Sequence, residues 1–245
     1  LVRLEDADQA SAAFLGALTP VTDYDLWFHL KTGERIAEQG EVPTRDPFSF
    51  GAEGAPWTAH SWLPEFVFYR TERAFGLIAV ALLKSLAIAG ALYLLFLRLA
   101  RRGIAPAAAA LILVPGILAA SGNFVTRPLV FSFPLFAGLL LLLEAGPPAV
   151  VWAVPILIGV WANSHGSFIL GIFLVWYFYA AEIVALFRGT PDLPRLSALG
   201  RALILSLAAA CLNPYGPALL AYPFLYLPGS AHYRYITEWQ PVDFG

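Results

Sequence analysis

From Gly76 onward the sequence consists largely of apolar runs joined by short connections. Six such runs cover residues 76–97, 104–120, 128–143, 149–162, 167–187 and 202–212. A helix that crosses a bilayer needs about 20 mainly apolar residues, because lipid cannot hydrogen-bond to its backbone. The repeated runs therefore predict an all-α fold, a polytopic integral membrane helical bundle.

The amino-acid composition agrees with this fold class and indicates which kinds of binding partner to expect. Hydrophobic residues make up 59% of the chain and charged residues 13%, with a mean hydropathy of +0.69. Soluble domains carry about 25% charged residues, so membrane lipid is an expected partner. The net charge of −2 excludes a broad basic surface, and we expect no nucleic acid partner. The single cysteine, Cys211, cannot form an internal disulfide.

The number of membrane spans depends on how the first apolar run of the chain is interpreted. The apolar run at residues 10–21 is too short to cross a bilayer unless it is the tail of a longer helix, and otherwise it lies in the interface. We therefore expect about six to seven spans in one transmembrane domain, residues 1–245. Because the chain starts at Leu1 and contains no methionine, it is interpreted either as lacking its initiator or as a fragment of a longer chain.

Residues 21–75 form the one long segment of mixed polarity. The apolar spacing predicts an amphipathic helix over Asp25–Gln39 that ends at Gly40, and a second over His60–Phe75. Prolines and glycines between them, in residues 41–56, predict a loop. Two such helices would lie in the membrane interface as the first outer loop.

Basic residues predict the orientation of the bundle. They gather in two connections, at Arg98, Arg101 and Arg102 and at Arg188, Arg195 and Arg201. By the positive-inside rule these connections are cytoplasmic. The bundle, residues 76–212, then places residues 21–75, 121–127, 163–166 and the segment 213–245 on the extracytoplasmic side.

The unusual polar residues fall on this predicted outer side. They are Asp23, Asp25, His29, His60, Glu65, Arg127, Asn163, His165 and Asn213, and the remaining histidine, His232, is there too. A single chemical face is typical of membrane enzymes and binding subunits. A transporter would carry charges at mid-depth, where Lys84 is the clear example.

Asp23 and Asp25 form the first candidate pair. Carboxylates are the ligands that hard cations prefer, so the pair could hold a divalent cation, Mg²⁺ or Mn²⁺, or supply a catalytic base. The alternative is structural, since either carboxylate, or Thr22, can cap the following helix. Asp25 and His29 are four residues apart and share one helix face, which suits metal binding or proton transfer.

The other candidates also have two interpretations each. His29 is a ligand or proton carrier, or an interfacial histidine that only hydrogen-bonds. Glu65, close to His60, belongs to a site or is favoured by the dipole of its helix. Arg127 can grip phosphate with its planar fork, or it extends to lipid headgroups.

Two further polar groups lie beside or within the apolar runs. Asn163 and His165 belong to the segment WANSHG at a helix turn, where an amide, a hydroxyl and an imidazole occur together. Lys84 must extend to the interface, face the bundle or pair with another group, and it is a candidate for holding a lipid phosphate.

Six segments carry a resemblance to known proteins: DYDLWFHLKTGERI, AHSWLPEFVFY, TRPLVFSF, WANSHGSFILG, LNPYG and ITEWQPVDF. Together they resemble a family of bacterial polytopic membrane proteins that is itself similar to the GT-C type glycosyltransferases. Those enzymes take sugars from polyprenyl-phosphate carriers. The resemblance runs from about residue 21 to the end of the chain and implies a location in the bacterial cytoplasmic (inner) membrane.

The resemblance also implies roles for particular residues. Asp23 or Asp25 matches the catalytic aspartate that follows the first span, and Glu65 matches a second acidic residue. A carboxylate would take the proton of the acceptor hydroxyl while Arg127, a histidine or a metal neutralises the departing phosphate. The chain departs from the family in its short first span and in the further C-terminal spans that it lacks.

We therefore expect a glycosyltransferase-like membrane protein that transfers a sugar from a polyprenyl-phosphate carrier to an acceptor on the extracytoplasmic face. The expected substrate-binding residues are His29, His60, Lys84, Arg127, Asn163 and His165. The rival prediction is a non-catalytic accessory subunit, whose aromatic-rich helices would pack against protein partners in a larger membrane complex.

Overall fold

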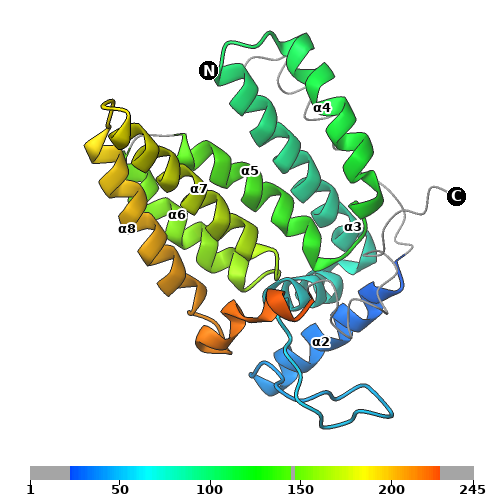
Figure 1. Ribbon diagram of the computed structural model, residues 1–245. Coiled ribbons are helices and arrows are strands. Elements are labelled where there is room, and N and C mark those ends of the chain that lie inside the picture. Colours follow the sequence, from blue (N-terminus) through cyan, green and yellow to red (C-terminus); the bar gives the residue numbers. More distant parts are fainter. Residues whose placement is uncertain (1–22, 145–146, 227–245) are drawn as a thin grey trace, which may run out of the picture.

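The computed structural model describes residues 23–144 and 147–226, and this part of the chain is helical, without a strand (Figure 1). The α-helices are α2 (Asp25–Gln39), α3 (Trp62–Arg101), α4 (Pro106–Ala120), α5 (Ser132–Leu143), α6 (Pro147–Ala162), α7 (Phe168–Phe187) and α8 (Leu193–Ala210). Short 3₁₀ helices are η1 (Ser121–Asn123), η2 (Pro128–Phe131), η3 (Gly216–Leu220) and η4 (Tyr222–Tyr226). The predicted all-α class is confirmed.

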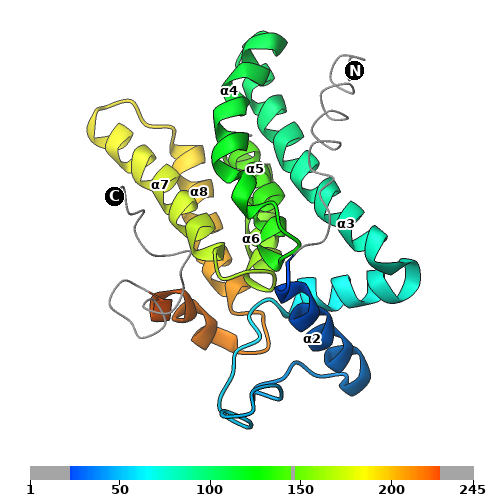
Figure 2. The same ribbon diagram turned by 90° about the vertical axis from the view of Figure 1, so that its right-hand side faces the viewer.

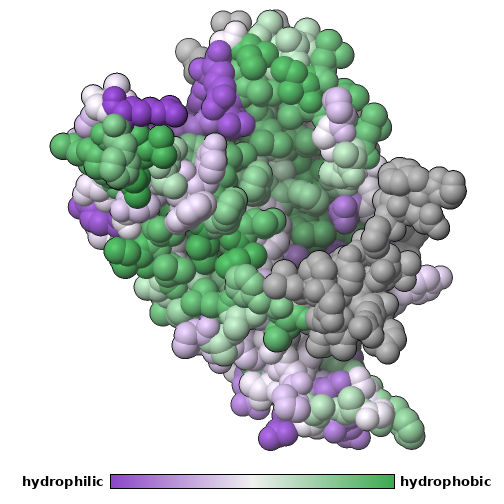
Figure 3. Space-filling view, in the orientation of Figure 1, coloured by the Kyte–Doolittle hydropathy of each residue, from purple (hydrophilic) through white to green (hydrophobic). Residues whose placement is uncertain are grey.

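Four helical stretches are long and apolar enough to cross a membrane: Trp62–Arg101, Pro106–Asn123, Phe168–Phe187 and Leu193–Ala210. Two shorter apolar stretches, Pro128–Leu143 and Val150–Ala162, lie between them in sequence. Hydrophobic residues cover the helical body in Figure 3, while hydrophilic ones gather towards its ends. Length and composition thus identify a membrane protein with four candidate spans, and the count of six to seven stays a prediction.

The first predicted helix is confirmed with the same bounds, Asp25–Gln39. It ends because Gly40 adopts a left-handed conformation (φ 71°) that only glycine reaches without strain. The predicted second helix, His60–Phe75, starts at Trp62 and ends where it was predicted to end, because the backbone of Gly76 is not helical (φ 79°, ψ 176°). The helix that follows in the first apolar run shares the label α3 with it across this sharp break.

The last predicted run, 202–212, is the tail of a longer helix. Helix α8 begins at Leu193 because Asp192 accepts a hydrogen bond from the backbone N–H of Arg195 (3.0 Å), and a proline follows in the first turn. Arg195 and Arg201 interrupt the apolar pattern without interrupting the helix. The predicted apolar run at residues 10–21 and His232 lie outside the described residues.

The helices pack around two cores. The larger core lies among α5, α6, α7 and α8 and includes Trp161 and Phe168, both almost fully buried. The smaller core joins α2 to α3 through Leu26, Leu30 and Phe68. Figure 2 shows α2 crossing the end of the bundle beside the first part of α3. Helix α2 therefore lies at one end of the molecule, which we call the α2 end.

Ion pairs join helices at the opposite end. Arg98 of α3 and Arg102, the residue after that helix, both contact Glu144 after α5, and Arg195 of α8 contacts Glu182 of α7 at 2.8 Å. Figure 1 shows the α7–α8 connection far from α2. These ion-paired basic residues therefore lie at the end of the bundle opposite α2.

Candidate functional site

Asp23, Asp25 and Arg127 form an ion cluster at the α2 end. The guanidinium group of Arg127 lies 2.6 Å (Nε) from Oδ2 of Asp23 and 3.0 Å (Nη2) from Oδ2 of Asp25. The Asp23 side chain is only 6% exposed, and 104 positions separate it from Arg127 in sequence. The cluster ties the start of α2 to the connection before η2.

Asp23 also contacts the start of α2, although the N-cap position of that helix is Tyr24 and has no side-chain cap. Its Oδ1 accepts the backbone N–H of Asp25 at 3.1 Å, in the first turn of α2. Arg127 supplies the positive charge between the two carboxylates. Within residues 23–144 and 147–226 no group of three or more His, Cys, Asp and Glu side chains is placed to hold a metal ion.

His29 and Glu65 form a second pair, one turn further along α2. Nδ1 of His29 lies 2.9 Å from Oε1 of Glu65 in the first turn of α3. The Glu65 side chain is 3% exposed and that of His29 is 15% exposed. The pair therefore connects a buried carboxyl group to a partly accessible imidazole.

His60 and His165 form a third group, from the segment before α3 and the α6–α7 turn. Their ring centroids are 5.8 Å apart, and His60 also stacks on Tyr222 at 4.6 Å. Burial is the main cause that lowers the pKa of His60 to about 4 and that of His165 to about 3, and the neighbouring His60 is the next cause for His165. Both rings are therefore neutral at pH 7.

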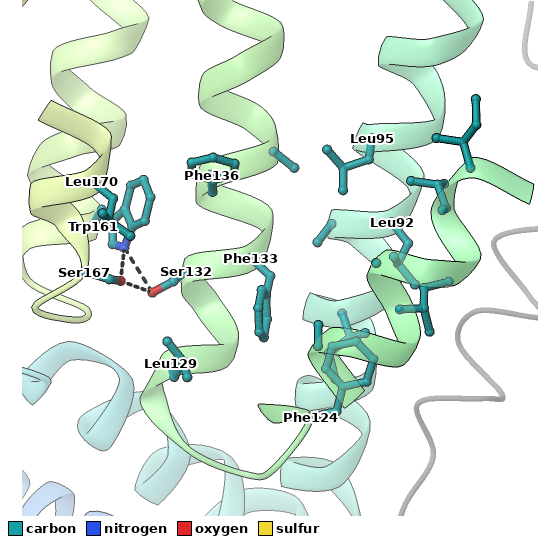
Figure 4. A pocket seen from close by; sticks show the side chains of 18 residues that line it. Leu92, Leu95, Phe124, Leu129, Ser132, Phe133, Phe136, Trp161, Ser167 and Leu170 are labelled. Atoms are coloured by element: carbon teal, nitrogen blue, oxygen red, sulfur yellow. Dashed lines mark hydrogen bonds between the residues drawn. The ribbon is translucent and has the colours of Figure 1, made fainter. Parts of the chain in front are cut away.

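A chain of hydrogen bonds leads from His165 into the bundle. Nδ1 of His165 lies 2.8 Å from the Ser167 hydroxyl, which lies 2.9 Å from the Ser132 hydroxyl. The indole N–H of Trp161 donates to both serines, at 3.0 and 3.1 Å (Figure 4). The third group is thus connected to side chains that line an internal cavity.

This cavity measures about 420 Å³ and lies between the α3–α4 pair and the helices α5 and α7. Figure 4 shows Leu92 and Leu95 on one side and Phe133 and Phe136 on the other. The walls are apolar apart from the serine and tryptophan groups at one end, where Ser167 also meets His165. An elongated apolar molecule fits such walls, because they offer it no polar partner along their length.

Asn163 and Lys84 occupy different surroundings. The Asn163 side chain accepts the indole N–H of Trp62 (2.8 Å) and donates to the carbonyls of Gly159 and Leu212, so it joins α3, α6 and the end of α8. Lys84 is fully buried in α3 beyond the break at Gly76 and faces the protein interior, not lipid.

Tyr215 is a residue that sequence reasoning did not single out. Its hydroxyl accepts the backbone N–H of Ala59 (2.7 Å) and donates to the carbonyl of Pro43 (3.0 Å), which fixes the loop before α3 against the segment after α8. Burial raises its pKa to about 12. The signal was the turn Asn213–Gly216, in which Asn213 Oδ1 accepts the backbone N–H of Tyr215 at 2.7 Å.

We expect Arg127→Gln to lower the free energy of unfolding by about 2 kcal/mol, because it leaves the carboxylates of Asp23 and Asp25 without their cation. Thermal unfolding in detergent measures the loss. Adding Asp23→Asn should restore about half of it. The control is Arg45→Gln, which removes one exposed hydrogen bond to Gly54 and should cost less than about 0.5 kcal/mol. Equal stabilities of Arg127→Gln and Arg45→Gln would contradict the cluster's role.

Comparison with protein-family models, with curated proteins and with solved structures finds no match to this chain.

Proposed function

We propose that the protein is a membrane glycosyltransferase-like enzyme, which transfers a sugar from a polyprenyl-phosphate carrier to an acceptor hydroxyl at the α2 end. In this proposal the α2 end faces away from the cytoplasm of a bacterial cell. The isoprenoid chain lies in the apolar cavity, and the phosphate and sugar lie among the polar groups around α2.

The observation that carries this proposal is a series of side-chain contacts that joins the wall of the cavity to the polar groups. Ser167 lines the cavity and contacts Nδ1 of His165 at 2.8 Å, and the ring of His165 lies 5.8 Å from that of His60. One amphiphilic molecule could therefore place its apolar chain in the cavity and its headgroup at the α2 end. A soluble substrate would not need the cavity.

The alternative is a non-catalytic subunit of a larger membrane complex. The observation that favours it is the row of aromatic residues on α7, where Phe173, Trp176 and Tyr177 are all about half exposed or more. Such a face also suits lipid, so it does not distinguish a protein partner from the bilayer.

The test is binding of undecaprenyl phosphate to the purified full-length protein, followed by native mass spectrometry. We expect wild type to retain the carrier and Gly116→Phe to bind it at least about tenfold more weakly. Gly116 lines the cavity, and no heavy atom lies within 4 Å of an added Cβ, so the ring has room to begin and would take space that the isoprenoid chain needs.

The matched control is Leu118→Phe on the same helix, since Leu118 is 70% exposed and does not line the cavity. Its affinity should stay within about twofold of wild type. Absence of carrier binding by wild type, with folded protein, would favour the subunit. Equal weakening by both variants would contradict the placement of the chain in the cavity.

A further inference from the structure

The pair His29–Glu65 has the geometry of an acid–base dyad. Oε1 of Glu65 lies 2.9 Å from Nδ1 of His29. Burial raises the pKa of Glu65, whereas the hydrogen bond with His29 lowers it. An ionised carboxylate oxygen can only accept a hydrogen bond, so in that form Glu65 would hold the proton of a neutral His29 ring on Nδ1. The lone pair of the other nitrogen, Nε2, is then free. Within the described residues no hydrogen bond is made by Nε2, and the side chain keeps 15% of its surface exposed.

Packing holds the two side chains in place. Gly33, one turn after His29, lets α2 approach α3 so closely that a Cβ there would lie 2.1 Å from the backbone oxygen of Glu65. The Glu65 side chain is almost fully buried, and its second oxygen, Oε2, has no hydrogen-bond partner in the described part of the chain. A buried carboxyl group with one unsatisfied oxygen needs its remaining partner, which is His29.

The other candidate acids and bases are already in contact with other groups. Asp23 and Asp25 both contact Arg127, and Asp23 also accepts the backbone N–H of Asp25. His60 and His165 are packed against each other, and Nδ1 of His165 already accepts the backbone N–H of Ser167.

We propose that His29 is the catalytic residue that accepts the proton of the attacking hydroxyl, and that Glu65 is its positioning residue. This inference rests on the proposed function. The acceptor oxygen forms a bond to the anomeric carbon while the bond between that carbon and the phosphate oxygen breaks. The electron pair of the broken bond leaves with the polyprenyl phosphate, and the hydroxyl proton moves to Nε2 of His29.

The first experiment tests the dyad without any substrate. Nitrogen-15 NMR of histidine-labelled full-length protein, at mildly alkaline pH, reports which ring nitrogen carries the proton, and the chain has only four histidines. We expect His29, assigned by its loss in His29→Gln, to be protonated on Nδ1. His165 is the internal reference with the opposite tautomer, because its Nδ1 accepts the backbone N–H of Ser167.

In Glu65→Gln we expect the proton of the His29 ring to move to Nε2, which is the more common tautomer. In Glu65→Asp part of the Nδ1–H signal should remain. A glutamate that packed beside His29 without accepting its N–H would not fix the tautomer. A wild-type His29 protonated on Nε2 would overturn the dyad, whatever the outcome for substrate.

The second experiment measures sugar release from undecaprenyl-phosphate-linked glucose, mannose and galactose. We expect His29→Ala to lose at least about 100-fold in rate while it binds undecaprenyl phosphate like wild type, and added imidazole to restore part of the rate. The control on the same helix is Lys31→Ala, an exposed residue outside the dyad. A His29→Ala rate within about threefold of wild type would overturn the inference, whereas a wild type that binds no carrier would overturn the proposed function.

Discussion

Replacing Gly33 with alanine should lower the free energy of unfolding by about 3 kcal/mol, the upper end of the usual range for overpacking. The added Cβ would lie 2.1 Å from the backbone oxygen of Glu65 and 2.7 Å from Cβ of Tyr69. Neither atom is the tip of a flexible side chain, so α2 must move away from α3. Alanine is the better helix former, so any loss reports the steric clash and not helix propensity.

The control for this substitution is Gly116→Ala in α4, where an added Cβ meets no heavy atom within 4 Å. It should be neutral or stabilise by up to about 1 kcal/mol. Thermal unfolding in detergent measures both variants, and the His29 tautomer should also change in Gly33→Ala because the dyad depends on this approach. Similar stabilities of the two variants would show that α2 does not pack on α3 as described.

Acid should destabilise the protein strongly between about pH 6 and about pH 4. The pKa of His60 is lowered to about 4 and that of His165 to about 3 by burial, from an ordinary value of 6.5. Below pH 6.5 these two histidines are protonated in the unfolded chain but stay neutral in the folded protein. Their contribution to the free energy of unfolding is therefore fully present above pH 6.5 and is lost as the pH drops. Two such groups together give a loss of about 2 kcal/mol per pH unit.

The measurement is the unfolding midpoint as a function of pH in one detergent, and the matched variant is His60→Phe. Phenylalanine keeps a ring against Tyr222 and removes one of the two titrating groups, so the slope should fall to about half. Well below the pKa of about 3 of His165, both histidines are protonated in either state and their contribution to the slope vanishes. Equal slopes for wild type and His60→Phe would contradict the burial of His60 as a neutral ring.

Local features of the chain could be predicted from its sequence. Helix α2 has the predicted bounds because its apolar spacing and the glycine at its end are both short-range signals. The start of α8 was missed because Arg195 and Arg201 interrupt the apolar run, although Asp192 is a capping residue that could have indicated it. The break at Gly76 falls at the predicted change from a mixed to an apolar segment.

The sequence indicated which residues belong to the candidate site, but not which of them contact one another. All the residues of the three polar groups were candidates, yet Arg127 was expected at a phosphate and lies against Asp23, 104 positions away. His29 and Glu65 meet across 36 positions, through an approach that only Gly33 permits. Periodicity describes one element at a time, whereas these contacts depend on how two elements dock.

The most direct measurement for the central claim, that the cavity and the α2 end form one site for a polyprenyl-phosphate carrier, is photocrosslinking. Undecaprenyl phosphate with a photoreactive diazirine in its chain is added to the full-length protein, and the labelled peptides are identified by mass spectrometry. We predict labels on cavity residues of α3, α4 and α5, such as Leu92, Ile117 and Phe133, that unlabelled carrier competes away. Labels confined to the exposed face of α7, at Phe173 and Trp176, would contradict the account.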